Sequence, residues 1–227
     1  WAAKFFQQQM FDTDEGKSIG LSYFKERGFR DDIIKKFELG YSPDVWDALT
    51  QSAITEGYNI QFLEETGLTI RKENEKFYDR FRGRVMFPIH SLTGRVIGFG
   101  GRTLKTDKAV AKYVNSPESD IYHKSNVLYG LCFANKSMRV EDNCYLVEGY
   151  ADVLSVHQAG IENVVASSGT SLTIEQIRMI GRFTRNITIL YDGDEAGIKA
   201  SLRGLDMILE EGLNVKIVLF PDGDDPD

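Results

Sequence analysis

The sequence has few of the residues that build disulfide frameworks and zinc sites. Cys132 and Cys144 are its only cysteines, three histidines accompany them in 227 residues, and no C-x-x-C spacing occurs. A zinc site or disulfide scaffold is therefore not expected, and two reduced thiols fit a cytoplasmic protein. A signal peptide is also lacking, as is any apolar run of about 18 residues that a membrane-spanning helix would need. These absences argue against a membrane protein.

An excess of positive charge is missing as well. The formal net charge is −7, which argues against a simple basic nucleic-acid binder. The charge is unevenly distributed: residues 1–70 carry 7 basic and 12 acidic side chains, residues 71–124 carry 12 and 6, and residues 125–227 carry 8 and 16. A basic segment between two acidic ones could bring phosphates to a carboxylate-held metal, and a solvated basic face is the alternative.

Residues 1–70 are typical of short amphipathic helices that serve as scaffold. Ser42-Pro43-Asp44 is expected to open one of these helices. The side chains expected on the buried side of this region include Val45, Trp46, Leu49 and Phe62.

The basic middle segment indicates a β-hairpin. Two apolar runs, 85–89 and 95–99, are joined by a turn at Thr93-Gly94, and Pro88 favours an edge or bulged position in the first strand. Residues 103–127 form a long connection, and such loops are often functional. This connection contains Lys112 and Tyr113, a pairing that suits a phosphate and a stacked base. The arginines expected around the hairpin are Arg80, Arg82, Arg84, Arg95 and Arg102.

From residue 128 onward, apolar strand-like runs alternate with helical patterns. The expected helices cover residues 128–138, 152–159 and 173–180, with a fourth ending near Gly212. The expected strands are 144–147, 163–166, 187–191 and 215–220. Continuous apolar strands separated by helices predict a mostly parallel four-stranded sheet with right-handed crossovers.

Three of these four strands are followed by carboxylates. Glu148 follows the first, with Asp152 one turn later; Asp192-Gly193-Asp194 follows the third, and the acidic cluster 222–227 follows the fourth. The second strand opens into Ser167–Ser171, a loop before a helix that suits an anion. Parallel strands end on one edge of a sheet, and clustered carboxylates repel one another without a cation. We therefore expect a Mg²⁺ site; an Asp-Gly turn with a helix-capping aspartate is the alternative.

The acidic motifs resemble the TOPRIM domain of bacterial DnaG-type DNA primases. They read Glu148-Gly-Tyr-Ala-Asp152, Asp192-Gly-Asp194-Glu-Ala-Gly197 and Asp222-Gly-Asp-Asp-Pro-Asp227. TOPRIM modules also occur in topoisomerases and nucleases, so the carboxylates alone do not select primase. The upstream motifs do, because they resemble the primase-specific subdomain: Tyr78-Asp-Arg-Phe-Arg82, Arg84-Val-Met-Phe-Pro-Ile89, Gly94-Arg-Val-Ile-Gly-Phe-Gly-Gly-Arg102, Lys112-Tyr-Val-Asn-Ser-Pro-Glu118 and His123-Lys124.

The resemblance implies an α/β protein with two domains. Residues 1–123 would form the mixed α/β primase-specific subdomain with a basic cleft, and residues 124–227 a TOPRIM domain truncated at its C-terminal end. The implied activity is that of a DNA-directed RNA polymerase, which synthesises short RNA primers on single-stranded DNA by metal-dependent nucleotidyl transfer. The implied cofactor is Mg²⁺, with Mn²⁺ as a substitute.

The resemblance also implies roles for individual residues. Glu148, Asp192 and Asp194 match the main catalytic metal site, and it stays open whether Glu148 is a ligand or a general base. Asp152, Asp225 and Asp227 match residues implicated in further metal binding. The residues that match the basic cleft for template and triphosphates are Arg80, Arg82, Arg102, Lys112, Tyr113, Asn115 and Lys124.

Two domains of the family have no counterpart here: an N-terminal zinc-binding domain and a C-terminal helicase-interacting domain. Because the sequence also begins at Trp1 without a methionine, we expect a monomeric piece of a longer protein, weakly active or inactive alone. The implied partners are single-stranded DNA, ribonucleoside triphosphates and the RNA primer, with a replicative helicase contacted through the missing domain, in the bacterial cytoplasm at the replisome. The alternatives are a TOPRIM topoisomerase or nuclease, and a non-catalytic TOPRIM nucleic-acid-binding module.

Overall fold

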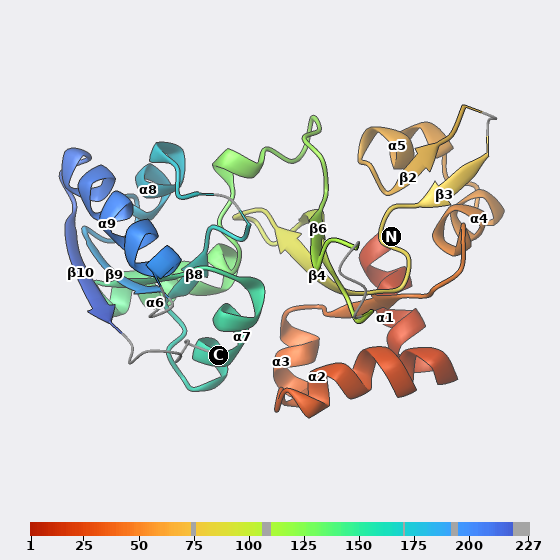
Figure 1. Cartoon of the computed structure of the whole chain (residues 1–227), viewed down its shortest axis with the longest axis horizontal. Coiled ribbons are helices and arrows are strands. Elements are labelled where there is room, and N and C mark those ends of the chain that lie inside the picture. The colour runs from red at the N-terminus through yellow and green to blue at the C-terminus, as the bar shows by residue number, and fades with distance from the viewer. Residues whose placement is uncertain (74–75, 106–109, 170, 192–194, 220–227) are drawn as a thin grey trace. The chain divides into compact units, whose positions relative to one another are not determined.

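The computed structural model describes residues 1–73, 76–105, 110–169, 171–191 and 195–219 (Figure 1). The chain divides into two compact units. The first unit comprises residues 1–89 and 96–123, and the second comprises residues 90–95 and 124–227. Within the described ranges, no helix combines the length and apolar character needed to cross a membrane.

Short helices dominate the first 70 residues, as the sequence predicts. Helix α1 packs against strand β1 (Gly40–Ser42), where a β-carbon added at Gly40 would lie 2.7 Å from Cβ of Phe6. Only glycine therefore allows this close approach. The helical elements of this part are α1 (Ala2–Asp12), a π-helix (η1, Gly16–Leu21), α2 (Ser22–Glu26), α3 (Asp31–Lys36), α4 (Ala48–Thr55) and α5 (Ile60–Glu65).

The prediction that Ser42 opens a helix is wrong. Residues 40–42 instead form β1, and α4 begins only at Ala48. Strand β1 pairs antiparallel with β4 (Arg84–His90), with Gly40 opposite Met86 and Ser42 opposite Arg84. Pairing with a distant strand outweighs the local helix signal, because a short segment takes its conformation largely from its neighbours.

Three of the side chains predicted to be buried are exposed. Val45, Trp46 and Phe62 expose 49%, 42% and 64% of their surface. The delayed start of α4 leaves Val45 and Trp46 outside the helix, and α4 buries Leu49 as predicted. In α5, the buried residue is Leu63, and its neighbour Phe62 lies on the exposed side of the helix.

The predicted hairpin is confirmed. Strands β4 and β5 (Val96–Thr103) are neighbours in a four-stranded sheet of order β1-β4-β5-β6, and the turn carries Gly94 at φ +80. Strand β1 reaches only as far as Met86 on β4, so Pro88 lies beyond it, where no β1 partner needs an amide hydrogen. Strand β6 (Tyr113–Asn115) lies inside the segment predicted as a plain connection. A separate two-stranded sheet pairs β2 (Thr69–Arg71) with β3 (Phe77–Asp79).

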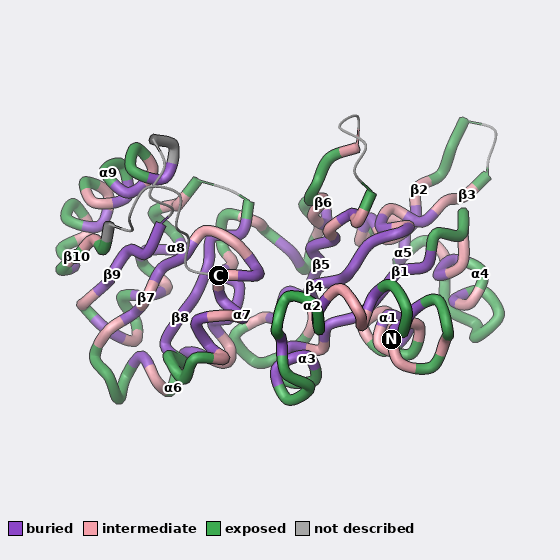
Figure 2. Tube along the Cα trace, turned by 60° about the horizontal axis from the view of Figure 1, so that its bottom comes forward, coloured by how far each residue is buried: buried purple, intermediate pink, exposed green. Residues whose placement is uncertain are grey.

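The second unit confirms the predicted parallel sheet. Its strands are β7 (Cys144–Val147), β8 (Val164–Ala166), β9 (Asn186–Tyr191) and β10 (Asn214–Leu219). They lie in the order β10-β9-β7-β8, and each neighbouring pair is parallel. Figure 2 shows β7, β8 and β9 buried along most of their length, as expected of strands covered on both faces.

Helices cover both faces of this sheet, so a ligand can approach it only at the two ends of its strands. Right-handed crossovers place α7 (Tyr150–Gln158) on one face, and α8 (Ile174–Ile180) and α9 (Glu195–Glu210) on the other (Figure 1). Helix α6 (Leu131–Glu141) precedes β7, and a short 3₁₀ helix (η2, Lys124–Asn126) leads into the unit. Helix α7 is followed by Gly160 at φ +96, a left-handed conformation that glycine adopts readily at the ends of helices.

Candidate functional site

The candidate site begins at the carboxyl ends of β7, β8 and β9. Val147 is paired with Ala166, and the amide of Ser168 donates to the carbonyl of Glu148 at 3.1 Å. The parallel ladder therefore continues one row past β7 and sets Glu148 beside Ser167. The register of β7 with β9, in which Leu146 faces Ile189, places Tyr191 on the other side of Glu148.

These three residues line one cavity of 390 Å³ on the α9 face of the sheet. Burial raises the pKa of the Tyr191 phenol, the negative charge of Glu148 raises it further, and a hydrogen bond with Ser167 offsets part of the shift. Tyr191 is therefore a neutral oxygen beside a carboxylate and a serine hydroxyl. The rest of the lining comes from the loop after β8 and from α9: Gly169, Ser171, Leu172, Ala200, Arg203, Gly204 and Met207.

Asp152, the further acidic residue predicted on α7, has a structural contact. It is the third residue of the helix, and its Oδ2 accepts a hydrogen bond from the amide of Gly149 at 2.7 Å. A carboxylate in the first turn satisfies a free helix amide and opposes the helix dipole. This contact explains why α7 starts at Tyr150, two residues before the predicted start.

The remaining predicted acidic residues, Asp192, Asp194, Asp225 and Asp227, lie outside the described residues. Within the described ranges, no cluster of three or more histidine, cysteine, aspartate or glutamate side chains is arranged to hold a metal ion. Strand β9 ends at Tyr191 and β10 at Leu219, paired in register with each other. The described part of the predicted metal site therefore consists of Glu148 at the carboxyl edge, with Asp152 in the first turn of α7.

In the first unit, the predicted basic residues fall into two groups. Arg102 faces Tyr113 across β5 and β6, its guanidinium lies 4.7 Å from the ring centre of Tyr23, and Asn115 faces Gly100. Arg102 and Lys112 line the same 490 Å³ groove. A cation on β5 and an exposed lysine beside β6 thus share one surface.

Arg80 and Arg82 make other contacts. Arg80 Nε donates to the carbonyl of Gly67 at 2.8 Å, and Arg82 Nε pairs with Asp44 at 3.1 Å. Lys124 belongs to the second unit, where its Nζ donates to the carbonyl of Gly169 at 3.0 Å, in the loop that lines the cavity beside Glu148.

Arg84 contacts the backbone next to this groove, a role that was not predicted from the sequence. It exposes only 7% of its surface, and burial lowers its pKa. Its Nη1 lies 3.1 Å from the carbonyl of Ala111 and 3.3 Å from those of Lys112 and Gly101. A buried arginine therefore holds the backbone of Lys112 against β5.

Sequence reasoning also missed an exposed aromatic surface around Trp46. The Trp46 and Tyr78 ring centres are 5.4 Å apart, Lys72 Nζ lies 4.4 Å from the centre of Trp46, and the Arg82 guanidinium lies 4.9 Å from it. Rings flanked by cations suit the bases and phosphates of a single strand. The polar neighbours Asp44 and Asp47 were the available signal that Trp46 is exposed.

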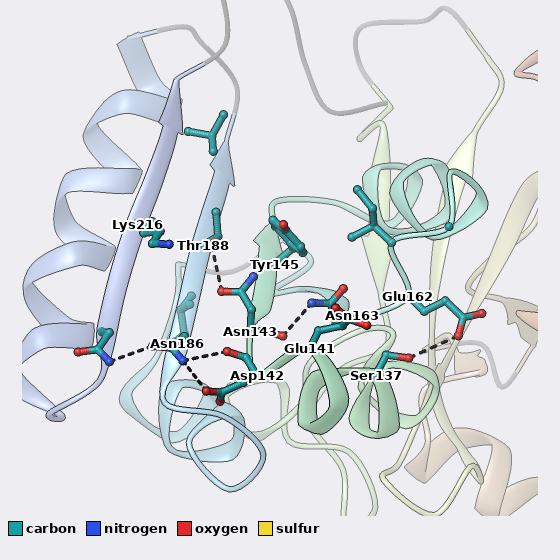
Figure 3. A pocket seen from close by; sticks show the side chains of 15 residues that line it. Ser137, Glu141, Asp142, Asn143, Tyr145, Glu162, Asn163, Asn186, Thr188 and Lys216 are labelled. Atoms are coloured by element: carbon teal, nitrogen blue, oxygen red, sulfur yellow. Dashed lines mark hydrogen bonds between the residues drawn. The ribbon is translucent and has the colours of Figure 1, made fainter.

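A larger cavity of 890 Å³ lies at the opposite, amino end of the parallel sheet (Figure 3). Its polar side chains bond to one another: Asn186 Nδ2 donates to Oδ2 of Asp142 at 3.0 Å, and the Thr188 hydroxyl donates to Oδ1 of Asn143 at 3.0 Å. These bonds join the starts of the strands. Ligands of open parallel sheets bind at the carboxyl ends, so the smaller cavity beside Glu148 is the better candidate.

Comparison with known families agrees with this geometry. The model for the DNA primase catalytic core, N-terminal domain, matches residues 5–135, and a Toprim-like model matches residues 145–227. The chain belongs to the DNA primase catalytic-core family. Because the primase model covers more than half of the chain, the comparisons do not favour a topoisomerase or nuclease. A Toprim domain also implies a divalent-metal site.

Individual primases are similar along the whole chain. A DNA primase of Halalkalibacterium halodurans is 45% identical over 100% of this chain, which spans 38% of that protein. The catalytic core of the Escherichia coli primase superposes with a TM-score of 0.90 at 40% identity, covering 100% of this chain and 72% of that one. A DnaG primase catalytic domain bound to single-stranded DNA superposes with a TM-score of 0.89 at 39% identity, covering 99% and 70%. The chain thus spans about two fifths of the length of the curated relative.

Proposed function

We propose that the chain is the catalytic core of a primase that synthesises short RNA primers on single-stranded DNA. The observation that carries this proposal is Glu148, set at the carboxyl edge of a Toprim sheet in a chain that belongs to the primase family. The proposed reaction is attack of a 3′-hydroxyl on the α-phosphate of a ribonucleoside triphosphate, with release of pyrophosphate.

The donor atoms beside Glu148 fit a hard divalent cation. Its carboxylate shares a cavity with the hydroxyls of Ser167 and Tyr191, and Mg²⁺ prefers oxygen ligands of this kind. Glu148 would hold the ion, and we propose Asp152, Asp192, Asp194, Asp225 and Asp227 as further ligands. When bound, the cation lowers the pKa of the attacking hydroxyl and offsets charge on the leaving oxygens; we propose Mg²⁺, with Mn²⁺ as a substitute.

The basic residues of the first unit would bind the substrates. Lys112 and Arg102, which share a groove, would hold phosphates through charge-assisted hydrogen bonds. The Trp46 surface would stack on template bases, with Lys72 and Arg82 beside the phosphates. Support comes from the relative that binds single-stranded DNA. We assign the same substrate-binding role to Arg80, Tyr113, Asn115 and Lys124.

The proposal extends to the whole protein. The domains of the core would be residues 1–123 and 124–227, with a substrate-binding role for the first and metal binding for the second. A zinc-binding domain and contact with a replicative helicase would belong to other parts of the protein, which would act at the replisome.

Primer synthesis by the full-length protein tests this proposal. With single-stranded DNA, ribonucleoside triphosphates and Mg²⁺ or Mn²⁺, we expect short labelled RNA, and no nicking or relaxation of supercoiled plasmid. Glu148→Gln should abolish synthesis while the circular dichroism spectrum stays that of the wild type. Glu210→Gln, which removes the same charge from an exposed position at the end of α9, is the matched control. Wild-type synthesis by Glu148→Gln would remove Glu148 from the site.

A further inference from the structure

The cavity beside Glu148 contains an arginine that the proposed function does not use. Arg203 lies on α9, is exposed, and lines the same 390 Å³ cavity as Glu148 and Ser167. Among the residues that the structure describes, no ion pair, hydrogen bond or ring contact involves its guanidinium. Two other arginines of this unit do have such contacts: Arg178 pairs with Glu211 at 2.8 Å, and the Arg139 guanidinium lies 5.0 Å from the ring centre of Phe183.

The loop after β8 supplies hydroxyl groups to this cavity. Ser167 and Ser171 line it, together with the backbone at Gly169. Ser167 is buried and its hydroxyl is held by the hydrogen bond with Tyr191, whereas Ser171 is exposed. Lys124 donates to the carbonyl of Gly169, so a second positive charge lies next to the same loop. The loop after β8 thus lies next to the Lys124 ammonium and lines a cavity that also contains the Arg203 guanidinium, which has no partner within the described ranges.

The guanidinium and the serine hydroxyls are donors that suit a phosphate group. A guanidinium offers two parallel N–H donors that match two oxygens of one phosphate, and serine hydroxyls add single donors. Glu148 repels a bare anion in the same cavity, so a phosphate can bind there only together with a divalent cation that offsets the carboxylate charge. Such a cavity therefore favours a metal-bound phosphate over a free one.

We propose that Arg203, with Ser167 and Ser171, forms a phosphate subsite beside Glu148 for a metal-bound nucleotide or nucleic-acid strand. The inference rests on the proposed function, because it takes Glu148 as a metal ligand. Two sources share this chemistry: the triphosphate of the incoming nucleotide and the phosphodiester backbone of the bound strand.

Equilibrium binding to the full-length protein tests the subsite and identifies the source. Arg203→Gln is compared with Arg182→Gln, which removes the same charge from an exposed arginine of the same unit that does not line the cavity. Binding of ATP with Mg²⁺ is followed by calorimetry, and binding of a labelled single-stranded oligonucleotide with Mg²⁺ by fluorescence anisotropy. Losing one charge-assisted hydrogen bond should lower the affinity for the affected ligand about tenfold. The control variant should bind both ligands as tightly as the wild type does.

Each outcome decides the proposal. Weaker binding of ATP assigns the subsite to the triphosphate, and weaker binding of the oligonucleotide assigns it to the backbone. If Arg203→Gln and Arg182→Gln both bind the two ligands as the wild type does, Arg203 is not part of a phosphate subsite. Ser171→Ala offers a second variant at an exposed position, for which a smaller weakening of the same ligand is expected.

These measurements also separate the subsite from the proposed function, because binding requires no turnover. A wild-type protein that binds ATP with Mg²⁺ through Arg203 but makes no primer would refute primer synthesis and keep the subsite. A wild-type protein that makes primers, with Arg203→Gln binding both ligands normally, would refute the subsite and keep primer synthesis.

Discussion

Replacing Arg84 with methionine tests whether a buried cation organises the substrate groove. Nη1 of Arg84 lies within 3.3 Å of the backbone carbonyls of Gly101, Ala111 and Lys112. The Lys112 carbonyl also accepts a hydrogen bond from the amide of Thr103 at 3.0 Å. Methionine keeps most of the apolar stem and cannot donate a hydrogen bond. The substitution therefore removes the donor while leaving the packing of the side chain largely intact.

The expected loss of stability follows from these contacts. Nη1 carries two hydrogens, so at most two full hydrogen bonds are lost even though three carbonyls are near. Each bond from a charged donor contributes about 1.5–3 kcal/mol, and relief of the desolvation of a buried charge offsets part of that, which leaves about 3 kcal/mol. For a chain of this size that corresponds to a melting temperature lower by roughly 6–12 °C.

Two assays check this prediction. Thermal unfolding gives the stability of the variant. The KM for nucleotides in primer synthesis reports on Lys112, and we expect it to rise because the backbone of Lys112 is held less firmly. Arg95→Met serves as the control, because Arg95 is exposed in the hairpin turn and its loss should change stability by less than about 0.5 kcal/mol. A melting temperature of Arg84→Met equal to that of Arg95→Met would refute the view that this arginine anchors the backbone before β6.

Two further predictions concern the first unit. Trp46→Ala should weaken binding of single-stranded DNA by about 1–3 kcal/mol, the contribution of one stacked base, in a fluorescence titration; Phe62→Ala, at a residue that is 64% exposed, is the control, and equal affinities would exclude the Trp46 surface. Asp79 accepts bonds from the amides of Leu49 and Thr50 at 2.7 and 3.1 Å, yet burial raises its pKa above the usual 3.8. A raised carboxyl pKa means that stability is lost as pH rises through it, so the advantage of the wild type over Asp79→Asn in urea unfolding should shrink as the pH rises above about 4, the ordinary pKa of an aspartate. A constant or growing advantage would contradict this sign.

The sequence by itself determines the parallel sheet of the second unit. Its strands are continuous apolar runs, and its helices carry local start and stop signals, such as the Thr173–Gln176 capping box of α8 and the glycine after α7. Signals of this kind act within a few residues, so they survive without knowledge of the fold. They also place Glu148 directly after a strand, which is why the carboxyl edge could be located.

Tertiary structure alone decides the features that depend on partners far away in the chain. Strand β1 exists because it pairs with β4, about 45 residues later, and β6 exists because it pairs with β5. The same holds for Arg84, whose burial follows from carbonyls 17 to 28 residues away. The row that unites Glu148, Ser167 and Tyr191 likewise requires the strand order β9-β7-β8, which crossover geometry sets and no local pattern records.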